Sequence, residues 1–279
     1  MTQNGQPDYE ATVERGLALA TDLALRAGTI LRDRLDAKRQ VVHKGVVDLV
    51  TDADHASEAL IWEGLKAVFP EHRMLGEEGS VGALATMAEQ PFGWVFDPLD
   101  GTTNYAHRFP HFAVSICLEH QSEPVVGVVY DPMRDELFAA RKGYGATMNG
   151  QPIAVSHTGE LVQSLLASGF SYDLTERASQ LVLWEHFNNR TQGVRRAGAA
   201  ALDLCYVANG RLDGYWERPV RPWDMGAGVI IVREAGGVVT ALEHDGFDLY
   251  TPEALAANPA IHRRMREAIA TVTGDTKPT

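Results

Sequence analysis

The chain has 279 residues, of which 45% are hydrophobic and 22% charged, proportions that exclude a disordered chain or a fibre and indicate a folded protein. Its formal net charge of −12 disfavours general affinity for nucleic acid, and an anionic substrate would need bound cations to reverse the local sign. The N-terminus lacks the basic and apolar blocks of a signal peptide, and no apolar run reaches the length of a membrane span, so we expect a cytoplasmic protein without a membrane partner.

Helical periodicity dominates the N-terminal part of the chain. Apolar residues at helical spacing predict a long amphipathic helix over about residues 9–35 and a second helix over about residues 52–69. Between them, valine pairs at residues 41–42 and 46–47 flank His43-Lys44-Gly45 and predict a short strand or hairpin.

A strand-like pattern follows. A buried strand is expected over residues 92–96, ending at Asp97, and three further runs predict an antiparallel meander over residues 113–118, 124–130 and 136–140. The elements expected after the meander are a strand at 165–170, helices at 175–188 and 199–208, a strand at 213–216, a helix at 224–235, a strand at 238–241 and a helix at 259–271. Cys117 and Cys205, far apart in apolar surroundings, are expected to be reduced and buried.

This mixture of helices and strands predicts an α+β protein rather than a regular doubly wound sheet. No Pro/Ser-rich linker divides the chain. We therefore expect a single domain over residues 1–279, whose approximate halves 1–150 and 151–279 share one active-site cleft.

The stretch Asp97-Pro98-Leu99-Asp100-Gly101-Thr102-Thr103-Asn104-Tyr105 is the most informative motif of the sequence. It places two carboxylates, a glycine turn and two hydroxyls directly after the buried strand. A carboxylate at a dry strand end needs compensation, and cations would supply it. The segment Gly101-Thr102-Thr103 could present backbone N–H groups to a phosphate, particularly if a helix begins there.

Other acidic residues have ordinary explanations when each is taken alone. Asp224 reads as a helix N-cap, Glu77-Glu78 as a solvated loop pair and Asp48 as a turn cap. Taken together with Asp97 and Asp100, these hard oxygen ligands suit Mg²⁺ or Mn²⁺ rather than zinc.

These motifs, in order, resemble those of the inositol monophosphatase family, the lithium-sensitive, metal-dependent sugar-phosphatase superfamily, in its bacterial branch. The resemblance runs from about Lys44 to Gly237, most of the chain. The segments that carry it, besides the stretch from Asp97 to Tyr105, are Lys44-Gly45-Val46-Val47-Asp48-Leu49-Val50-Thr51, Gly76-Glu77-Glu78, Arg195-Arg196-Ala197-Gly198-Ala199-Ala200-Ala201-Leu202-Asp203-Leu204, Asp213-Gly214-Tyr215-Trp216-Glu217 and Trp223-Asp224-Met225-Gly226-Ala227-Gly228. It implies a layered αβαβα sandwich of the sugar-phosphatase type, with mixed and antiparallel sheets, and a homodimer.

By this resemblance, Glu77, Asp97 and the carbonyl oxygen of Leu99 would hold one Mg²⁺, and Asp97, Asp100 and Asp224 a second. A third, weaker ion would lie beside Glu77, and Mn²⁺ could replace Mg²⁺. Asp100, Gly101 and Thr102 would meet the phosphate. The alcohol side would be lined by Gly198, Ala199, Ala200 and Glu217.

The implied reaction is hydrolysis of a small phosphorylated alcohol, inositol 1-phosphate, by a metal-activated water without a covalent phosphoenzyme. Glu77 and Thr102 would position the water, with Asp48 hydrogen-bonded to Thr102 as a base relay. Arg218 and Arg221 beside Glu217 could favour an extra anionic group or could be solvated surface charges.

Three alternatives stay open at this point. Histidinol phosphate, fructose 1,6-bisphosphate or a 3'-phosphonucleotide would suit the same metal chemistry, because only a few side chains read the alcohol. A regulatory or RNA- or protein-associated factor on a phosphatase fold belongs to another class. If the motifs were only caps and turns, metal would not shift the thermal stability.

Overall fold

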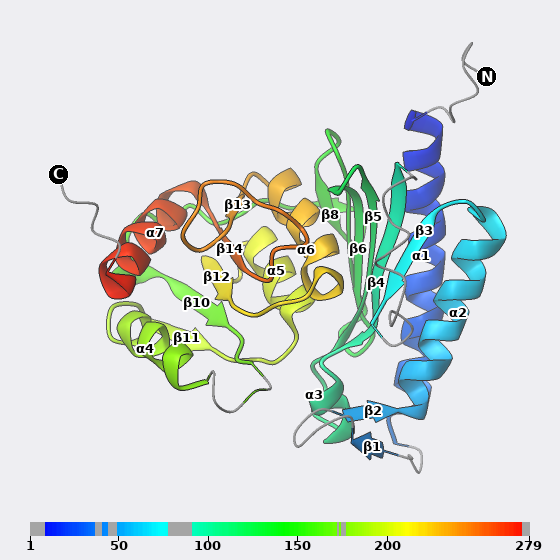
Figure 1. The fold of residues 1–279 in the computed structure, drawn as a ribbon, viewed down its shortest axis with the longest axis horizontal. Helices are drawn as coiled ribbons and strands as arrows, with labels where there is room; N and C mark the ends of the chain where they lie inside the picture. The colour runs from blue at the N-terminus through cyan, green and yellow to red at the C-terminus, as the bar shows by residue number, and fades with distance from the viewer. Residues whose placement is uncertain are drawn as a thin grey trace.

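The structure is a computed structural model that describes residues 9–36, 41–43, 49–77, 91–171, 173 and 177–274. Helices and sheets alternate in five layers, which confirms the predicted αβαβα arrangement (Figure 1). In order across the molecule, the layers are helices α1 and α2, a seven-stranded sheet, helices α5 and α6, a five-stranded sheet, and helices α4 and α7.

The outer helices of the first layer are α1 (Tyr9–Arg34) and α2 (Asp52–Val68), as their periodicity predicts. The face of α1 that includes Leu23, Ala27 and Leu31 is buried against the seven-stranded sheet. Strands β1 (Val41–His43) and β2 (Leu49–Thr51) form the expected antiparallel hairpin between these helices. Its second strand lies at Leu49–Thr51, whereas the predicted residues 46–47 lie outside the described ones.

The seven-stranded sheet contains the predicted meander. Its strands, in spatial order, are β3 (Arg73–Gly76), β4 (Phe92–Asp100), β5 (Ala113–His120), β6 (Glu123–Asp131), β7 (Glu136–Arg141), β8 (Ala146–Met148) and β9 (Gln151–Pro152). Among the described strands of this sheet, β3 and β4 alone pair in parallel, so the sheet is mixed. Short helix α3 (Thr102–Ala106) follows β4 directly.

The five-stranded sheet is also mixed, with parallel pairs β10–β11 and β10–β12 and antiparallel pairs made by β14. Its strands, in spatial order, are β11 (Gly193–Arg195), β10 (Leu165–Ser168), β12 (Gly214–Glu217), β14 (Ala254–Ala257) and β13 (Val238–Thr240). The helices of this part are α4 (Arg177–Asn188), α5 (Ala200–Ala208), α6 (Pro222–Glu234) and α7 (Pro259–Thr273), and the 3₁₀ turn η2 lies at Leu161–Gln163.

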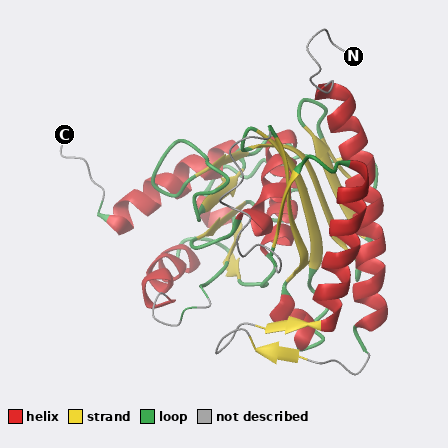
Figure 2. Ribbon diagram, turned by 45° about the vertical axis from the view of Figure 1, so that its right-hand side comes forward, coloured by secondary structure: helices red, strands yellow, loops and turns green. Residues whose placement is uncertain are grey.

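Helices α5 and α6 form the central layer and pack on both sheets (Figure 2). Gly127 of β6 illustrates how tightly they pack, because a Cβ atom there would lie 2.4 Å from the carbonyl oxygen of Ala227 on α6. Cys117 and Cys205 are free and buried, as predicted. Among the described helices, none combines the length and apolar composition that crossing a membrane requires.

Among the boundaries that differ from the sequence-based predictions, two lie beside the acidic motifs. Strand β4 continues through Asp97 to Asp100 instead of ending at Asp97. Helix α6 begins at Pro222 rather than at Asp224, so Asp224 lies inside the first turn. Proline with its fixed φ is favourable at the first helical position, and this displaces the helix start by two residues.

Candidate active site

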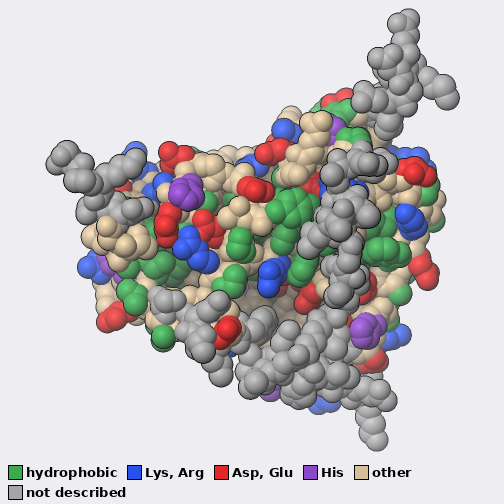
Figure 3. All heavy atoms as spheres, viewed as in Figure 1, with side chains coloured by type: hydrophobic (Ala, Val, Ile, Leu, Met, Phe, Trp, Pro, Cys, Tyr) green, Lys and Arg blue, Asp and Glu red, His purple; other side chains and the backbone are tan. Residues whose placement is uncertain are grey.

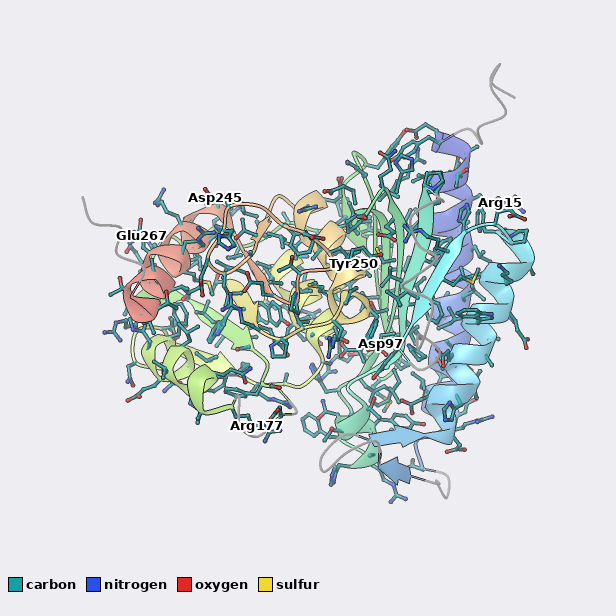
Figure 4. All side chains as sticks on the ribbon, in the orientation of Figure 1. Arg15, Asp97, Arg177, Asp245, Tyr250 and Glu267 are labelled. Carbon is teal, nitrogen blue, oxygen red and sulfur yellow. The ribbon has the colours of Figure 1, made fainter. Side chains whose placement is uncertain are left out.

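One cavity of about 710 Å³ brings the predicted residues together. In Figure 4, Asp97 lies between the two sheets, close to the middle of the molecule. The predicted site residues that line the cavity are Glu77, Asp97, Leu99, Asp100, Gly101, Thr102, Gly198, Ala199, Ala200, Glu217 and Asp224. Asp48 and Glu78 lie outside the described residues.

A β-bulge at the end of β4 directs the two central carboxylates into this cavity. Asp97 is paired with Ser115 and Asp100 with Ala113, so β4 carries one extra residue between the two pairs. The N–H of Leu99 donates to Asp97 Oδ1 at 2.8 Å. The strand then turns through Gly101, whose φ of +93° favours glycine.

Asp100 also joins the two halves of the chain. Its Oδ1 and Oδ2 accept hydrogen bonds from the backbone N–H groups of Ala200 at 3.2 Å and Ala201 at 2.8 Å. These N–H groups lie at the start of α5, where helical N–H groups lack intrahelical partners. A residue of β4 therefore acts as the acceptor that a local N-cap would otherwise supply, and it fixes α5 beside the cavity.

Asp224 serves its own helix in a similar way. The backbone N–H of Arg221, the N-cap residue of α6, donates to Asp224 Oδ2 at 2.8 Å. The structural explanation that the sequence offered is therefore correct in part, although Asp224 is the third residue of the helix rather than its cap. The same carboxyl group is close enough to Asp97 for a hydrogen bond between them.

The carboxylates are electrostatically unfavourable neighbours. Burial raises the pKa of Asp97 well above its ordinary value, and the charges of Glu77, Asp100 and Asp224 raise it further. Burial likewise raises the pKa of Asp100, and that of Asp224 to about 7. Ionising all of them together requires a nearby cation.

The donors that line the cavity include the carboxyl groups of Glu77, Asp97, Asp100 and Asp224. Within the described residues, no three His, Cys, Asp or Glu side chains form a complete metal-binding group. Zinc sites favour Cys and His ligands, whereas Mg²⁺ takes carboxylate, carbonyl and water oxygens. Buried, mutually repelling oxygen donors on the wall of a cavity therefore fit Mg²⁺.

Thr102 has an acidic neighbour that the sequence analysis missed. Its hydroxyl lies 3.1 Å from the carbonyl oxygen of Leu99 and 3.4 Å from Asp54 Oδ1, in positions to donate to either. Asp54 is fully buried on α2. In sequence it reads as an ordinary acid in the first turn of a helix, and only the packing of α2 beside β4 reveals its contact with the motif.

The alcohol side of the cavity contains Glu217 at the end of β12. Its Oε2 accepts a hydrogen bond of 2.6 Å from the Tyr215 hydroxyl. Burial raises the pKa of Glu217 to about 7. Gly169 leaves room for this carboxyl group, since a Cβ atom at residue 169 would lie about 2.0 Å from it.

Charged residues to which the sequence analysis gave no role also line this side, among them Asp203 and Arg196. The two arginines that the sequence singled out differ in place. Arg221 lines the cavity, whereas Arg218 pairs with Glu243 at 3.0 Å and with Glu253.

Comparisons with known proteins agree with this geometry. The model of the inositol monophosphatase family matches residues 12–275. An inositol-1-monophosphatase of Synechocystis sp. is 46% identical over 97% of this chain and 94% of its own length. Nus factor SuhB of Escherichia coli is 40% identical over 89% of this chain and 93% of its own. The solved structure of the Anabaena inositol monophosphatase superposes with a TM-score of 0.84 and 44% identity, covering 94% of this chain and 97% of that one.

Proposed function

Because the chain belongs to the inositol monophosphatase family of phosphoric monoester hydrolases, we propose that it hydrolyses inositol 1-phosphate to inositol and phosphate. The observation that carries the proposal is the convergence of Asp97, Asp100 and Asp224 on one cavity that also contains Glu217. The family is metal-dependent, generally with Mg²⁺. We also propose that the two halves of the chain form one domain around this cavity.

Two Mg²⁺ ions are proposed, and Asp97 would bridge them. Glu77, Asp97 and the Leu99 carbonyl would hold the first, and Asp97, Asp100 and Asp224 the second. A third ion beside Glu77 and replacement by Mn²⁺ belong to the same proposal. When bound, the ions would neutralise the phosphate dianion and act as Lewis acids toward the attacking water and the leaving oxygen.

The side chains of the protein then orient the reactants. Glu77 and Thr102 hold the attacking water from the side of β3 and α3. Because the Thr102 hydroxyl donates its hydrogen toward the Leu99 carbonyl or Asp54, its oxygen is left to accept from that water. The proton released by the water moves toward this acidic side, through Thr102 to Asp48 or Asp54.

The phosphate and the alcohol occupy opposite parts of the cavity. The backbone N–H groups of Gly101 and Thr102 meet the phosphate, while Glu217 and the segment from Gly198 to Ala200 line the alcohol. A water beside Asp224 donates a proton to the leaving oxygen. Holding the reactants in line in this way contributes more than proton transfer alone, which is worth about 10²–10⁴-fold.

Phosphate release from a panel of esters tests the proposal. The panel contains inositol 1-phosphate, histidinol phosphate, fructose 1,6-bisphosphate and a 3'-phosphonucleotide, each with Mg²⁺, with Mg²⁺ plus Li⁺, and with EDTA. We expect Mg²⁺-dependent release that is fastest for inositol 1-phosphate and inhibited by Li⁺. Absence of metal-dependent release from every ester would refute the proposed function.

A second role is supported by the relative named Nus factor SuhB. Acidic and basic side chains are interspersed over the face drawn in Figure 3, which favours a protein partner over nonspecific RNA binding. If the cellular role survives Asp97→Asn, this second role is independent of hydrolysis. We also propose a cytoplasmic homodimer, which fractionation and light scattering would test.

A further inference from the structure

Asp203 has a feature that the proposed mechanism does not use. It lies in the first turn of α5, its side chain is 2% exposed, and it lines the cavity. Among the described residues, no side-chain or backbone group forms a hydrogen bond or ion pair with its carboxylate. Burying a carboxylate without such a partner is costly, so its retention calls for a ligand.

The position at a helix start does not account for Asp203. An acidic residue there commonly accepts from backbone N–H groups of the first turn. In α5, the N–H groups of Ala200 and Ala201 already donate to Asp100, and the Asp203 N–H donates to the carbonyl oxygen of Ala199 at 3.0 Å. The Asp203 carboxylate is therefore available to the cavity.

Glu217 is an acidic neighbour of Asp203, and both residues line the cavity. Burial raises the pKa of Asp203, and the Glu217 carboxylate raises it further. Tyr215 donates to Glu217 Oε2 and leaves Oε1 for another donor. The pair therefore offers carboxyl oxygens as hydrogen-bond acceptors to whatever enters, and a carboxyl group that keeps its proton can also donate.

Hydroxyl groups match this arrangement, whereas a second phosphate does not. A phosphate dianion carries acceptors and negative charge, and whichever of the two carboxyl groups is ionised would repel it. Arg196 and Arg221 are exposed and could attract an anion, but both already face acids. The charge of Arg196 lowers the pKa of Asp203 and Glu217, and that of Arg221 lowers the pKa of Asp224.

We propose that Asp203 is a specificity-determining residue that, with Glu217, accepts hydrogen bonds from hydroxyl groups of the leaving alcohol. The pocket thereby selects polyol monophosphates and disfavours esters that carry a second phosphate on that side. This inference rests on the proposed phosphatase function.

The test compares Asp203→Ala and Asp203→Asn with the wild type on two esters. Inositol 1-phosphate presents hydroxyls to the pair, and p-nitrophenyl phosphate does not. We expect Asp203→Ala to lower kcat/KM for inositol 1-phosphate by about 10- to 100-fold, as loss of a hydrogen bond to a charged group does, and Asp203→Asn to lower it less. Activity on p-nitrophenyl phosphate should stay within about twofold, and kcat/KM for fructose 1,6-bisphosphate relative to inositol 1-phosphate should rise in both variants. Asp22→Asn, an exposed change on α1, is the matched control.

Thermal unfolding supplies a readout that does not need catalysis. Without ligand, Asp203→Ala should unfold at the same or a higher temperature, because it removes a buried carboxyl group that none of the described groups hydrogen-bonds. Free myo-inositol should raise the midpoint of the wild type and of Asp22→Asn but not that of Asp203→Ala.

The outcomes separate this inference from the proposed function. Equal losses on both esters, or an unchanged preference, would overturn the role of Asp203 even if the wild type is an active phosphatase. The wild type could hydrolyse neither ester while myo-inositol stabilises the wild type but not Asp203→Ala. This result would refute the phosphatase function and retain the polyol contact. Equal stabilisation of the wild type and Asp203→Ala by myo-inositol would also overturn the proposed role of Asp203.

Discussion

Replacing Glu217 with Gln should stabilise the metal-free protein at alkaline pH while it weakens hydrolysis. Burial is the main reason that the pKa of Glu217 rises to about 7, and this cost falls on the ionised carboxylate. Gln cannot ionise. Its amide oxygen can still accept the hydrogen bond that Tyr215 now donates at 2.6 Å.

The magnitude follows from the folded and unfolded pKa values. Below an ordinary pKa of 4.5, the carboxyl group is protonated in both states and folding is not penalised. As the pH rises from 4.5 to about 7, the unfolded chain ionises first, so stability falls, and above pH 7 the penalty is constant. A difference of about 2.5 between the two pKa values corresponds to about 3 kcal/mol. Water in the cavity reaches part of the side chain, so we expect Gln to recover about 2 kcal/mol.

Thermal unfolding in EDTA at pH 4.5 and pH 8.5 measures this effect. For a chain of this size, the midpoint of Glu217→Gln should exceed that of the wild type by about 4 °C at pH 8.5 and match it at pH 4.5. With Mg²⁺, kcat/KM for inositol 1-phosphate should fall. Glu63→Gln on the exposed face of α2 is the control and should show no pH-dependent difference. A midpoint that is unchanged or lower at pH 8.5 would refute the reasoning.

Three further changes probe the metal site and the packing. Residues that only support the ligands of a metal site change affinity or activity by about 10–100-fold when they are mutated. Asp97→Asn, which alters a proposed ligand, should therefore lower Mg²⁺-dependent phosphate release by more than that and abolish the Mg²⁺-dependent rise in Tm. Retention of either property would exclude Asp97 as a ligand. Tyr250→Phe removes a 2.6 Å hydrogen bond to buried Glu119. The free energy of unfolding measured in urea should fall by about 1.5–3 kcal/mol, while kcat should not change. A loss of kcat without destabilisation would show that this contact serves the active site instead. Gly127→Ala would place a Cβ atom 2.4 Å from the Ala227 carbonyl oxygen. This change should lower the free energy of unfolding by about 1–3 kcal/mol. A variant as stable as the wild type would mean that α6 can move away from β6.

Local patterns account for what the sequence could predict. The periodicity of α1 and the alternation of β5 to β7 are properties of neighbouring residues, so their boundaries are close to the expected ones. The start of α6 was misplaced because the acidic Asp224 resembles an N-cap while Pro222 in fact begins the helix.

Residues whose significance comes from distant segments were not predictable in this way. Asp54 reads as a helix-start acid, and its contact with Thr102 spans 48 positions of sequence. Asp203 likewise reads as an acid in the first turn of α5. The importance of Asp203 depends on two distant residues. Asp100 accepts the hydrogen bonds of the N–H groups at the start of α5, and the charge of Glu217 acts on the Asp203 carboxyl group.

Asp100 explains why the phosphate side and the alcohol side of the cavity are held in register. It comes from β4 in the first sheet, yet its carboxylate oxygens accept from the start of α5, which carries Asp203 and follows Ala199. An ordinary N-cap at residue 199 would satisfy α5 locally and leave it free to shift against β4. Because Ala199 has no side-chain acceptor, the helix obtains this acceptor from the acidic motif. A change at Asp100 should therefore alter alcohol selectivity as well as metal dependence, whereas a residue that only bound metal would alter the second alone.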